Sequence, residues 1–118
     1  MFNFEKLEVW NAAIEFADNV YSVTRNFPEA ERFGLTNQMR RAAVSISSNI
    51  AEGSSRNSRT DFARFVEIAT GSVFEVVSQA TIGKRQGFLS NEQYQALYVA
   101  SEKQGRMLSG LRASLLNS

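Results

Sequence analysis

Apolar residues recur every three to four positions along most of the chain, which is the period of an α-helix. No segment shows the strict alternation of apolar and polar residues that is typical of a strand. The pattern predicts four helices, over residues 4–25, 33–52, 59–85 and 91–116. Because the helices are long and their connections short, helices adjacent in sequence are expected to run antiparallel. We therefore predict an all-α fold, an up-down-up-down four-helix bundle that residues 1–118 form as a single domain.

The first predicted helix carries two adjacent apolar stripes. Together they span roughly 200°, against about 100° for an ordinary surface helix. The stripe expected to face the core of the subunit contains Leu7, Trp10, Ile14, Ala17 and Tyr21. The stripe expected to contact a second subunit contains Val9, Ala13, Phe16, Val20 and Val23. An apolar arc this wide predicts a homo-oligomer, because an edge helix of a small monomeric bundle cannot cover it.

The third predicted helix adds two residues to this expected oligomer interface. Gly71 lies in the middle of the helix, where glycine costs about 1 kcal/mol relative to alanine. The pair Gly71-Ser72 therefore predicts the close approach of another backbone. Ile68 lies on the same band of the helix and is expected to belong to the same interface.

Helix starts and stops are also marked in the sequence. Gly53 and Gly87 are the expected C-terminal stops of the second and third helices. Two capping boxes predict the starts of the third and fourth helices, at Ser58-Arg59-Thr60-Asp61 and Ser90-Asn91-Glu92-Gln93. Pro28 separates the first helix from the second.

Composition argues against an enzyme. The 118 residues include no histidine and no cysteine, so imidazole general bases, thiolate nucleophiles and Cys/His zinc sites are excluded. We expect no catalytic residue, no metal and no cofactor. One alternative remains, a magnesium-dependent nuclease that would use Glu52, Glu67 and Glu75, since Mg²⁺ needs only one or two carboxylates. No apolar run is long enough to cross a membrane and no signal peptide is visible, so the expected location is the cytoplasm.

Charge is distributed unevenly, although the net charge of the chain is only +1. Residues 1–31 carry two basic and six acidic side chains, a net charge of −4. Residues 32–64 carry six arginines and two acidic side chains, a net charge of +4. Arginine favours planar, bidentate partners, either carboxylate or phosphate. Charge alone favours pairing with the acidic first segment, and the alternative is a nucleic-acid surface formed by Arg40, Arg41, Arg56, Arg59 and Arg64.

A polar line follows the apolar stripe of the second helix, within the unusual stretch Ser45-Ile46-Ser47-Ser48-Asn49-Ile50-Ala51-Glu52-Gly53. Serine and asparagine compete with helical hydrogen bonds, so their number here requires a reason. Small polar residues that permit tight helix packing are the favoured interpretation, and a recognition surface is the alternative. We expect a structural polar network formed by Arg41, Asn49, Glu52 and Glu75.

These residues resemble a known family. The sequence around Leu7-x-Val9-Trp10, the Phe27-Pro28 pair and the centre Ser45-Ile46-x-x-Asn49-Ile50-Ala51-Glu52-Gly53 are similar to the four-helix-bundle family of 23S rRNA intervening-sequence proteins. A related branch is the accessory protein of diversity-generating retroelements, which binds nucleic acid. The resemblance implies a bacterial protein that assembles as a homopentameric ring.

The sequence thus leads to two functional hypotheses. The first is a non-enzymatic homo-oligomer that binds RNA or DNA through arginine–phosphate contacts. The second is a protein–protein adaptor, with an unidentified protein partner and no nucleic-acid role. No interaction with a membrane is expected under either hypothesis.

Overall fold

The computed structural model describes residues 1–117 and consists of four long helices with two short 3₁₀ turns. The helices are α1 (Glu8–Thr24), α2 (Leu35–Ser54), α3 (Arg59–Arg85) and α4 (Asn91–Leu116), and the turns are η1 (Asn3–Lys6) and η2 (Glu29–Glu31). The described residues contain no strand. The predicted all-α fold with four helices is therefore confirmed.

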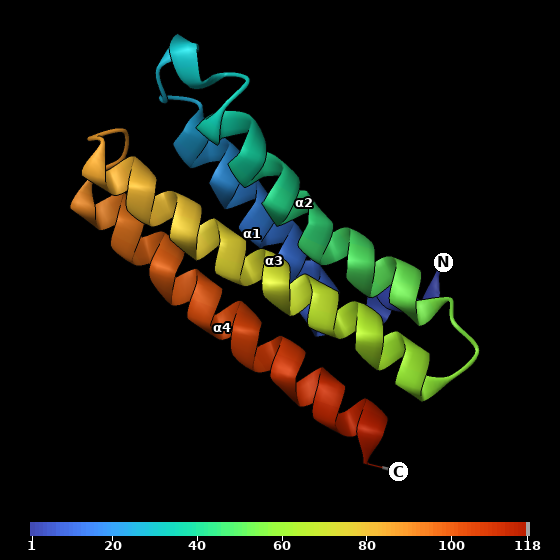
Figure 1. Cartoon of the computed structure of the whole chain (residues 1–118). Coiled ribbons are helices and arrows are strands. Elements are labelled where there is room, and N and C mark those ends of the chain that lie inside the picture. Colours follow the sequence, from blue (N-terminus) through green and yellow to red (C-terminus); the bar gives the residue numbers. More distant parts are fainter. Residues whose placement is uncertain (118) are drawn as a thin grey trace.

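The helices lie side by side in a rod of 46 × 22 × 21 Å, and consecutive helices run in opposite directions (Figure 1). Hydrogen bonds between helices show which parts of neighbouring helices lie side by side. The start of α3 reaches the end of α4, because Arg59 donates to the carbonyls of Ser114 and Leu115. The first and last helices also touch, since the buried Gln104 of α4 donates from Nε2 to the Val9 carbonyl at 3.2 Å.

Local side-chain signals explain where α3 and α4 begin and end. Ser58 accepts a hydrogen bond from the Asp61 N–H at 3.0 Å, and Ser90 and Gln93 form a complete capping box. Gly87 has a φ of +80°, and the N–H of Phe88 reaches back to the Gly83 carbonyl at 2.8 Å. That pair of features is a Schellman stop. The predicted ranges 59–85 and 91–116 are confirmed.

Gly53 and Gly71 have the reverse of their predicted roles. Gly53 does not stop α2, which continues to Ser54, and it is buried where α2 meets α3. A Cβ there would lie 2.7 Å from the Phe65 Cβ and 2.8 Å from the Phe62 Cδ1. Gly71, by contrast, is exposed and has no neighbouring atom within 4 Å of an added Cβ. The close backbone approach therefore occurs at Gly53 within the subunit.

The two apolar stripes of α1 also face opposite ways from the prediction: the stripe expected at the surface lies in the core. Val9, Ala13, Phe16 and Val20 are buried in the core of the subunit. They therefore cannot contact a second subunit, and the prediction that they form the oligomer interface is wrong. The other stripe lies toward the surface and is partly buried. Two contacts cover part of it: the Phe4 ring packs edge-on against Trp10 at 5.0 Å, and Arg40 stacks over Tyr21 at 4.6 Å.

Candidate nucleic-acid interface

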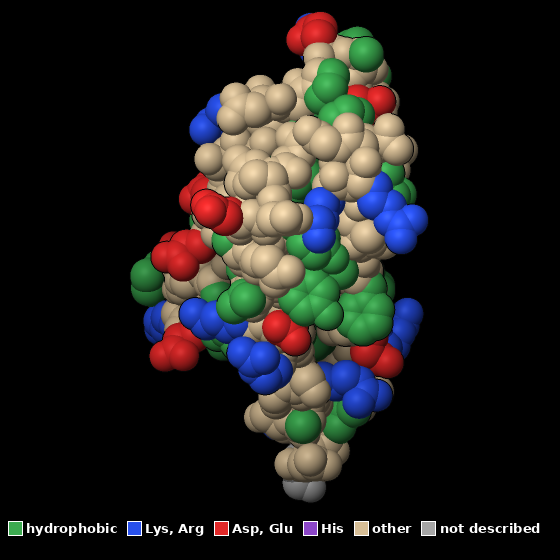
Figure 2. Space-filling view, turned by 90° about the vertical axis from the view of Figure 1, so that its left-hand side faces the viewer, with side chains coloured by type: hydrophobic (Ala, Val, Ile, Leu, Met, Phe, Trp, Pro, Cys, Tyr) green, Lys and Arg blue, Asp and Glu red, His purple; other side chains and the backbone are tan. Residues whose placement is uncertain are grey.

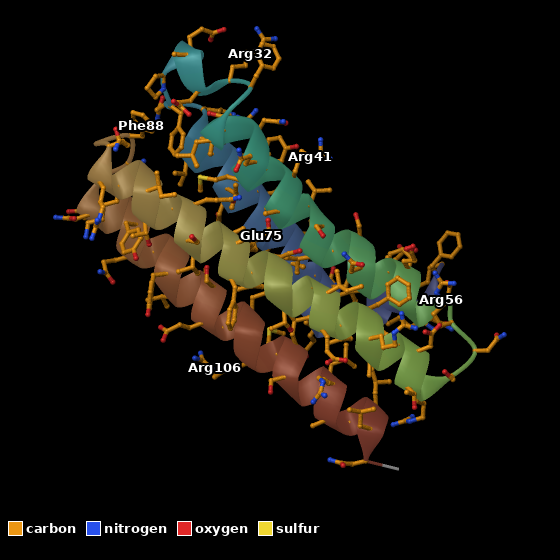
Figure 3. The ribbon with its side chains drawn as sticks, in the orientation of Figure 1. Arg32, Arg41, Arg56, Glu75, Phe88 and Arg106 are labelled. Atoms are coloured by element: carbon orange, nitrogen blue, oxygen red, sulfur yellow. The ribbon has the colours of Figure 1, made fainter. Side chains whose placement is uncertain are left out.

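The five arginines of the predicted nucleic-acid surface do not form one group. Arg40 and Arg41 lie near the start of α2, whereas Arg56, Arg59 and Arg64 lie around the α2–α3 connection. At 1.5 Å per helical residue, the two groups are about 20 Å apart along the bundle. Figure 3 shows the separation, with Arg41 and Arg56 toward opposite ends of α2. A single compact phosphate footprint is therefore excluded.

Arg40 holds the junction of α1 and α2. Its Nε donates to the Thr24 Oγ1 at 2.9 Å, and its Nη2 reaches the Tyr21 carbonyl at 3.5 Å. Carbonyls in the last turn of a helix carry a partial negative charge and attract cations. Arg40 therefore has a structural role at the C-terminal end of α1 that the sequence analysis did not anticipate.

Arg59 has the corresponding role for α4. Its Nε donates to the Leu115 carbonyl at 3.1 Å, and its Nη2 donates to the Ser114 carbonyl. Both acceptors belong to the last turn of α4, where the helix dipole favours a cation. Arg59 fastens the end of α4 to the start of α3, and these hydrogen bonds make it unsuited to serve primarily as a phosphate ligand.

We expect Arg59→Ala to lower the free energy of unfolding by about 1–2 kcal/mol, because hydrogen bonds from a charged donor are lost. The last turn of α4 should fray, and hydrogen exchange at its amides should accelerate. Arg106→Ala, a change on the exposed surface of the same helix, is the control and should leave both measurements unaltered. Unchanged exchange in the Arg59 variant would contradict this role.

Arg56 and Arg64 share one carboxylate at the start of α3. Asp61 lies 2.9 Å from the Arg64 Nη1 and 3.9 Å from the Arg56 Nε. Arg56 also lies 3.7 Å from the Glu52 carboxylate and stacks over Phe65. The partners of these two arginines therefore come from neighbouring positions in the chain, and not from the acidic segment 1–31.

This arrangement surrounds a shallow polar hollow of about 460 Å³, which Arg56, Asn57, Ser58, Thr60, Asp61 and Arg64 line together with Ser55. The Arg64 side chain is 70% exposed, so it remains accessible to a ligand. Exposed ion pairs contribute about 0–1 kcal/mol, so the pair with Asp61 holds Arg64 only weakly.

The polar network on α2 differs in its members from the prediction. Asn49 donates from Nδ2 to the carbonyl and the Oγ of Ser45, at 2.8 and 3.0 Å. The Ser72 Oγ of α3 donates to the same Ser45 Oγ at 3.0 Å. These three short side chains link α2 to α3, so the serine-rich stretch serves tight helix packing. Of the predicted network only Asn49 belongs to this cluster; its partner is Ser45, which in turn bonds Ser72.

The other predicted members of the network lie outside it. Glu52 pairs with Arg56, as described above. Arg41 and Glu75 are exposed, and within residues 1–117 no hydrogen bond or ion pair joins them, although both face the same side of the bundle (Figure 3). Arg41 is therefore an exposed cation that is available to a partner.

The three carboxylates of the magnesium hypothesis do not converge. Among the described residues no group of three or more acidic side chains is placed to hold a metal ion. Glu67 lies 3.6 Å from Arg112 of α4, and Glu52 forms an ion pair with Arg56. The proposed use of Glu52, Glu67 and Glu75 as one metal site is therefore wrong.

Large apolar side chains reach the surface of α3. Phe74 is 72% exposed, and Ile68 and Ile82 are each 51% exposed. Of these three, Phe74 lines a groove of about 540 Å³ between α3 and α4, together with Val73, Val77, Tyr98 and Arg106. Figure 2 shows hydrophobic side chains at the surface in the middle of one face, with charged side chains around them. Of the predicted oligomer interface, Ile68 and Gly71 thus remain accessible.

The fold and this surface define a small four-helix protein with exposed arginines and exposed apolar residues. The chain belongs to the 23S rRNA-intervening sequence protein family, whose model matches residues 5–110. It is also similar to a protein of unknown function from the S23 ribosomal protein family of Bacteroides thetaiotaomicron, known from a crystal structure. That similarity has a TM-score of 0.77 and 26% sequence identity, and it covers 93% of this chain and 99% of that one. No curated protein matches the chain.

Within the described residues, no helix combines the length and the apolar character needed to cross a bilayer.

Proposed function

We propose that this protein is a non-enzymatic, homo-oligomeric helical bundle that binds RNA through arginine–phosphate contacts. The observation that carries the proposal is membership of a family named for an insertion in 23S ribosomal RNA, with a match over residues 5–110. The absence of a catalytic role is inferred from the sequence, which contains no histidine and no cysteine. No cofactor is proposed.

Of the five arginines that the sequence suggested, three suit this function. Arg41 and Arg64 are exposed, and the pair that Arg64 forms with Asp61 is a weak surface ion pair. Arg56 is a third candidate because it borders the same hollow as Arg64. Arg40 and Arg59 are assigned to the helix junctions that they hold. The proposed RNA contacts are therefore Arg41, Arg56 and Arg64.

The oligomer, for which the family resemblance implies a pentameric ring, is part of the same proposal. Its support within the subunit is the exposed apolar surface of α3, at Ile68, Phe74 and Ile82. Large apolar side chains left exposed along one helix are candidates for a contact surface. A ring would repeat the same arginines around its circumference, and multivalent contact raises the affinity for a long anionic chain.

A protein–protein adaptor without RNA binding is the second candidate function. The observation favouring it is that Arg56 and Arg64 already have carboxylate partners in Asp61 and Glu52. The exposed Phe74 and the apolar groove beside it would then serve a protein partner.

RNA binding across a salt series tests the proposal, on a sample whose mass has been measured by light scattering. The expected result is an oligomer whose affinity for RNA falls steeply as salt rises, because bound counterions are released. Arg41→Gln/Arg64→Gln should weaken binding at least about tenfold at low salt and flatten the salt dependence. The matched control, Arg85→Gln/Arg106→Gln, removes the same charge from exposed positions elsewhere.

Three results would count against the proposal. No RNA binding at low salt would favour the adaptor. Equal losses in the variant and in the control would show that net charge, and not this surface, governs binding. A monomeric mass would contradict the oligomer.

A further inference from the structure

A second cationic hollow lies at the corner where the chain passes from α1 to α2. Its volume is about 240 Å³, and its polar lining consists of Arg25, Arg32, Arg40, Thr24, Thr36 and Glu29. We propose that this hollow is a binding site for a single phosphate group. The site lies at the opposite end of α2 from the Arg56–Arg64 hollow, and the inference does not depend on the proposed RNA-binding function.

Arg40 is held in place before any ligand arrives. Its guanidinium stacks over Tyr21 at 4.6 Å, and its Nε donates to the Thr24 Oγ1 at 2.9 Å. Thr24 is itself buried and donates to the Val20 carbonyl at 2.8 Å. Within residues 1–117 the Arg40 Nη1 has no hydrogen-bond partner, so it can donate to a ligand. A fixed side chain loses little conformational freedom on binding, which favours affinity.

The balance of charge distinguishes this hollow from the one at the start of α3. Three arginines and one glutamate line it, which leaves a net charge of +2. Glu29 lies 3.5 Å from the Arg32 Nη1, but these side chains are 86% and 66% exposed, so the pair is weak and easily exchanged. Arg25 is exposed and has no ion pair among the described residues. At the other hollow, by contrast, Asp61 contacts both arginines.

The donors and the size of the hollow point to a phosphate. Guanidinium groups bind phosphate oxygens through paired, planar hydrogen bonds, and the Thr36 hydroxyl is a further donor in the lining. A volume of 240 Å³ is smaller than the roughly 300–1,000 Å³ of sites for drug-sized ligands. The hollow therefore fits the phosphate group of a larger molecule and not a whole cofactor. That group can come from the RNA backbone or from a free phosphate ester.

Titration calorimetry with inorganic phosphate in a low-salt buffer tests the site. The variant is Arg25→Gln/Arg32→Gln, which removes two exposed arginines and leaves the Arg40 contacts with Thr24 and Tyr21 intact. We expect the wild-type chain to bind phosphate and the variant to bind it at least about tenfold more weakly. The Arg85→Gln/Arg106→Gln control should match the wild type. The absence of phosphate binding by the wild type, or equal weakening in the control, would overturn the inference.

Two further measurements identify the source of the phosphate. If the RNA backbone supplies it, Arg25→Gln/Arg32→Gln should also weaken binding of a short RNA. If a free ester supplies it, RNA affinity should be unchanged while binding of a nucleoside monophosphate falls with that of phosphate. The Arg41→Gln/Arg64→Gln variant should keep its phosphate site under either result. A protein that binds phosphate but not RNA would thus reject the proposed function and support this inference.

Discussion

Replacing Phe16 by alanine is expected to lower the free energy of unfolding by about 3–5 kcal/mol, the range for truncating a buried phenylalanine. Phe16 is 2% exposed and lies in the middle of the α1 row that faces the core. Both the lost apolar contact and the cavity left behind contribute to this loss. Denaturant unfolding measures the change, and the mass measured by light scattering should be unaltered, because Phe16 lies inside the subunit.

The matched control is Ile14→Ala on the other stripe of the same helix. Ile14 is 36% exposed, so the loss there should be about 1 kcal/mol or less. If Phe16→Ala lowered the measured mass but left the subunit as stable as before, Phe16 would lie at a subunit interface. That result would contradict the observed packing.

Replacing Gly53 by valine is expected to cost about 2–3 kcal/mol through overpacking. The Cβ alone would come within 2.7 Å of the Phe65 Cβ, which is fixed to the α3 backbone, so α2 and α3 would have to separate. Gly110→Ala in α4 is the control, because nothing lies within 4 Å of a Cβ at that position. That control should be stabilised by up to about 1 kcal/mol, the helix-propensity difference between glycine and alanine.

Thermal or denaturant unfolding of both glycine variants gives the comparison. If Gly53→Val were as stable as the wild type, the close approach of α2 and α3 at this position would be refuted. The opposite signs expected for two helical glycines make the test independent of any general effect of removing glycine.

The parts of the fold that could be predicted from the sequence depend on short-range signals. Ser58 and Ser90 each bond an N–H three residues ahead, and Gly87 turns the chain with a positive φ. Such signals involve residues a few positions apart, so they are visible in the sequence itself. This explains why the bounds of α3 and α4 were predicted correctly.

The orientation of α1 could not be predicted in the same way. Both of its stripes are apolar, and periodicity alone does not say which one faces α2 and α4. The choice depends on contacts outside the helix itself: Arg40 of α2 stacks over Tyr21, and Gln104 of α4 bonds the Val9 carbonyl. The same limit applies to Gly53, since its neighbours Phe62 and Phe65 belong to the next helix.

The candidate site was predictable only as a set of arginines. Their residue type and clustering indicate an affinity for oxyanions, but not which of them are already engaged. Arg59 bonds carbonyls 55 and 56 positions away, and Arg40 bonds Thr24 across the turn between α1 and α2. Arg25 and Arg32 were overlooked because they stand on either side of Pro28 and converge only when the chain folds around that corner.

The contact between Gln104 and Val9 has a consequence for how the chain folds. Most helix pairs in this rod are joined by short connections, so each can form soon after its two members do. The α1–α4 seam instead joins residues 95 positions apart, which makes its loop-closure entropy the largest of the bundle. We therefore expect this seam to close last during folding and to open first in the native protein.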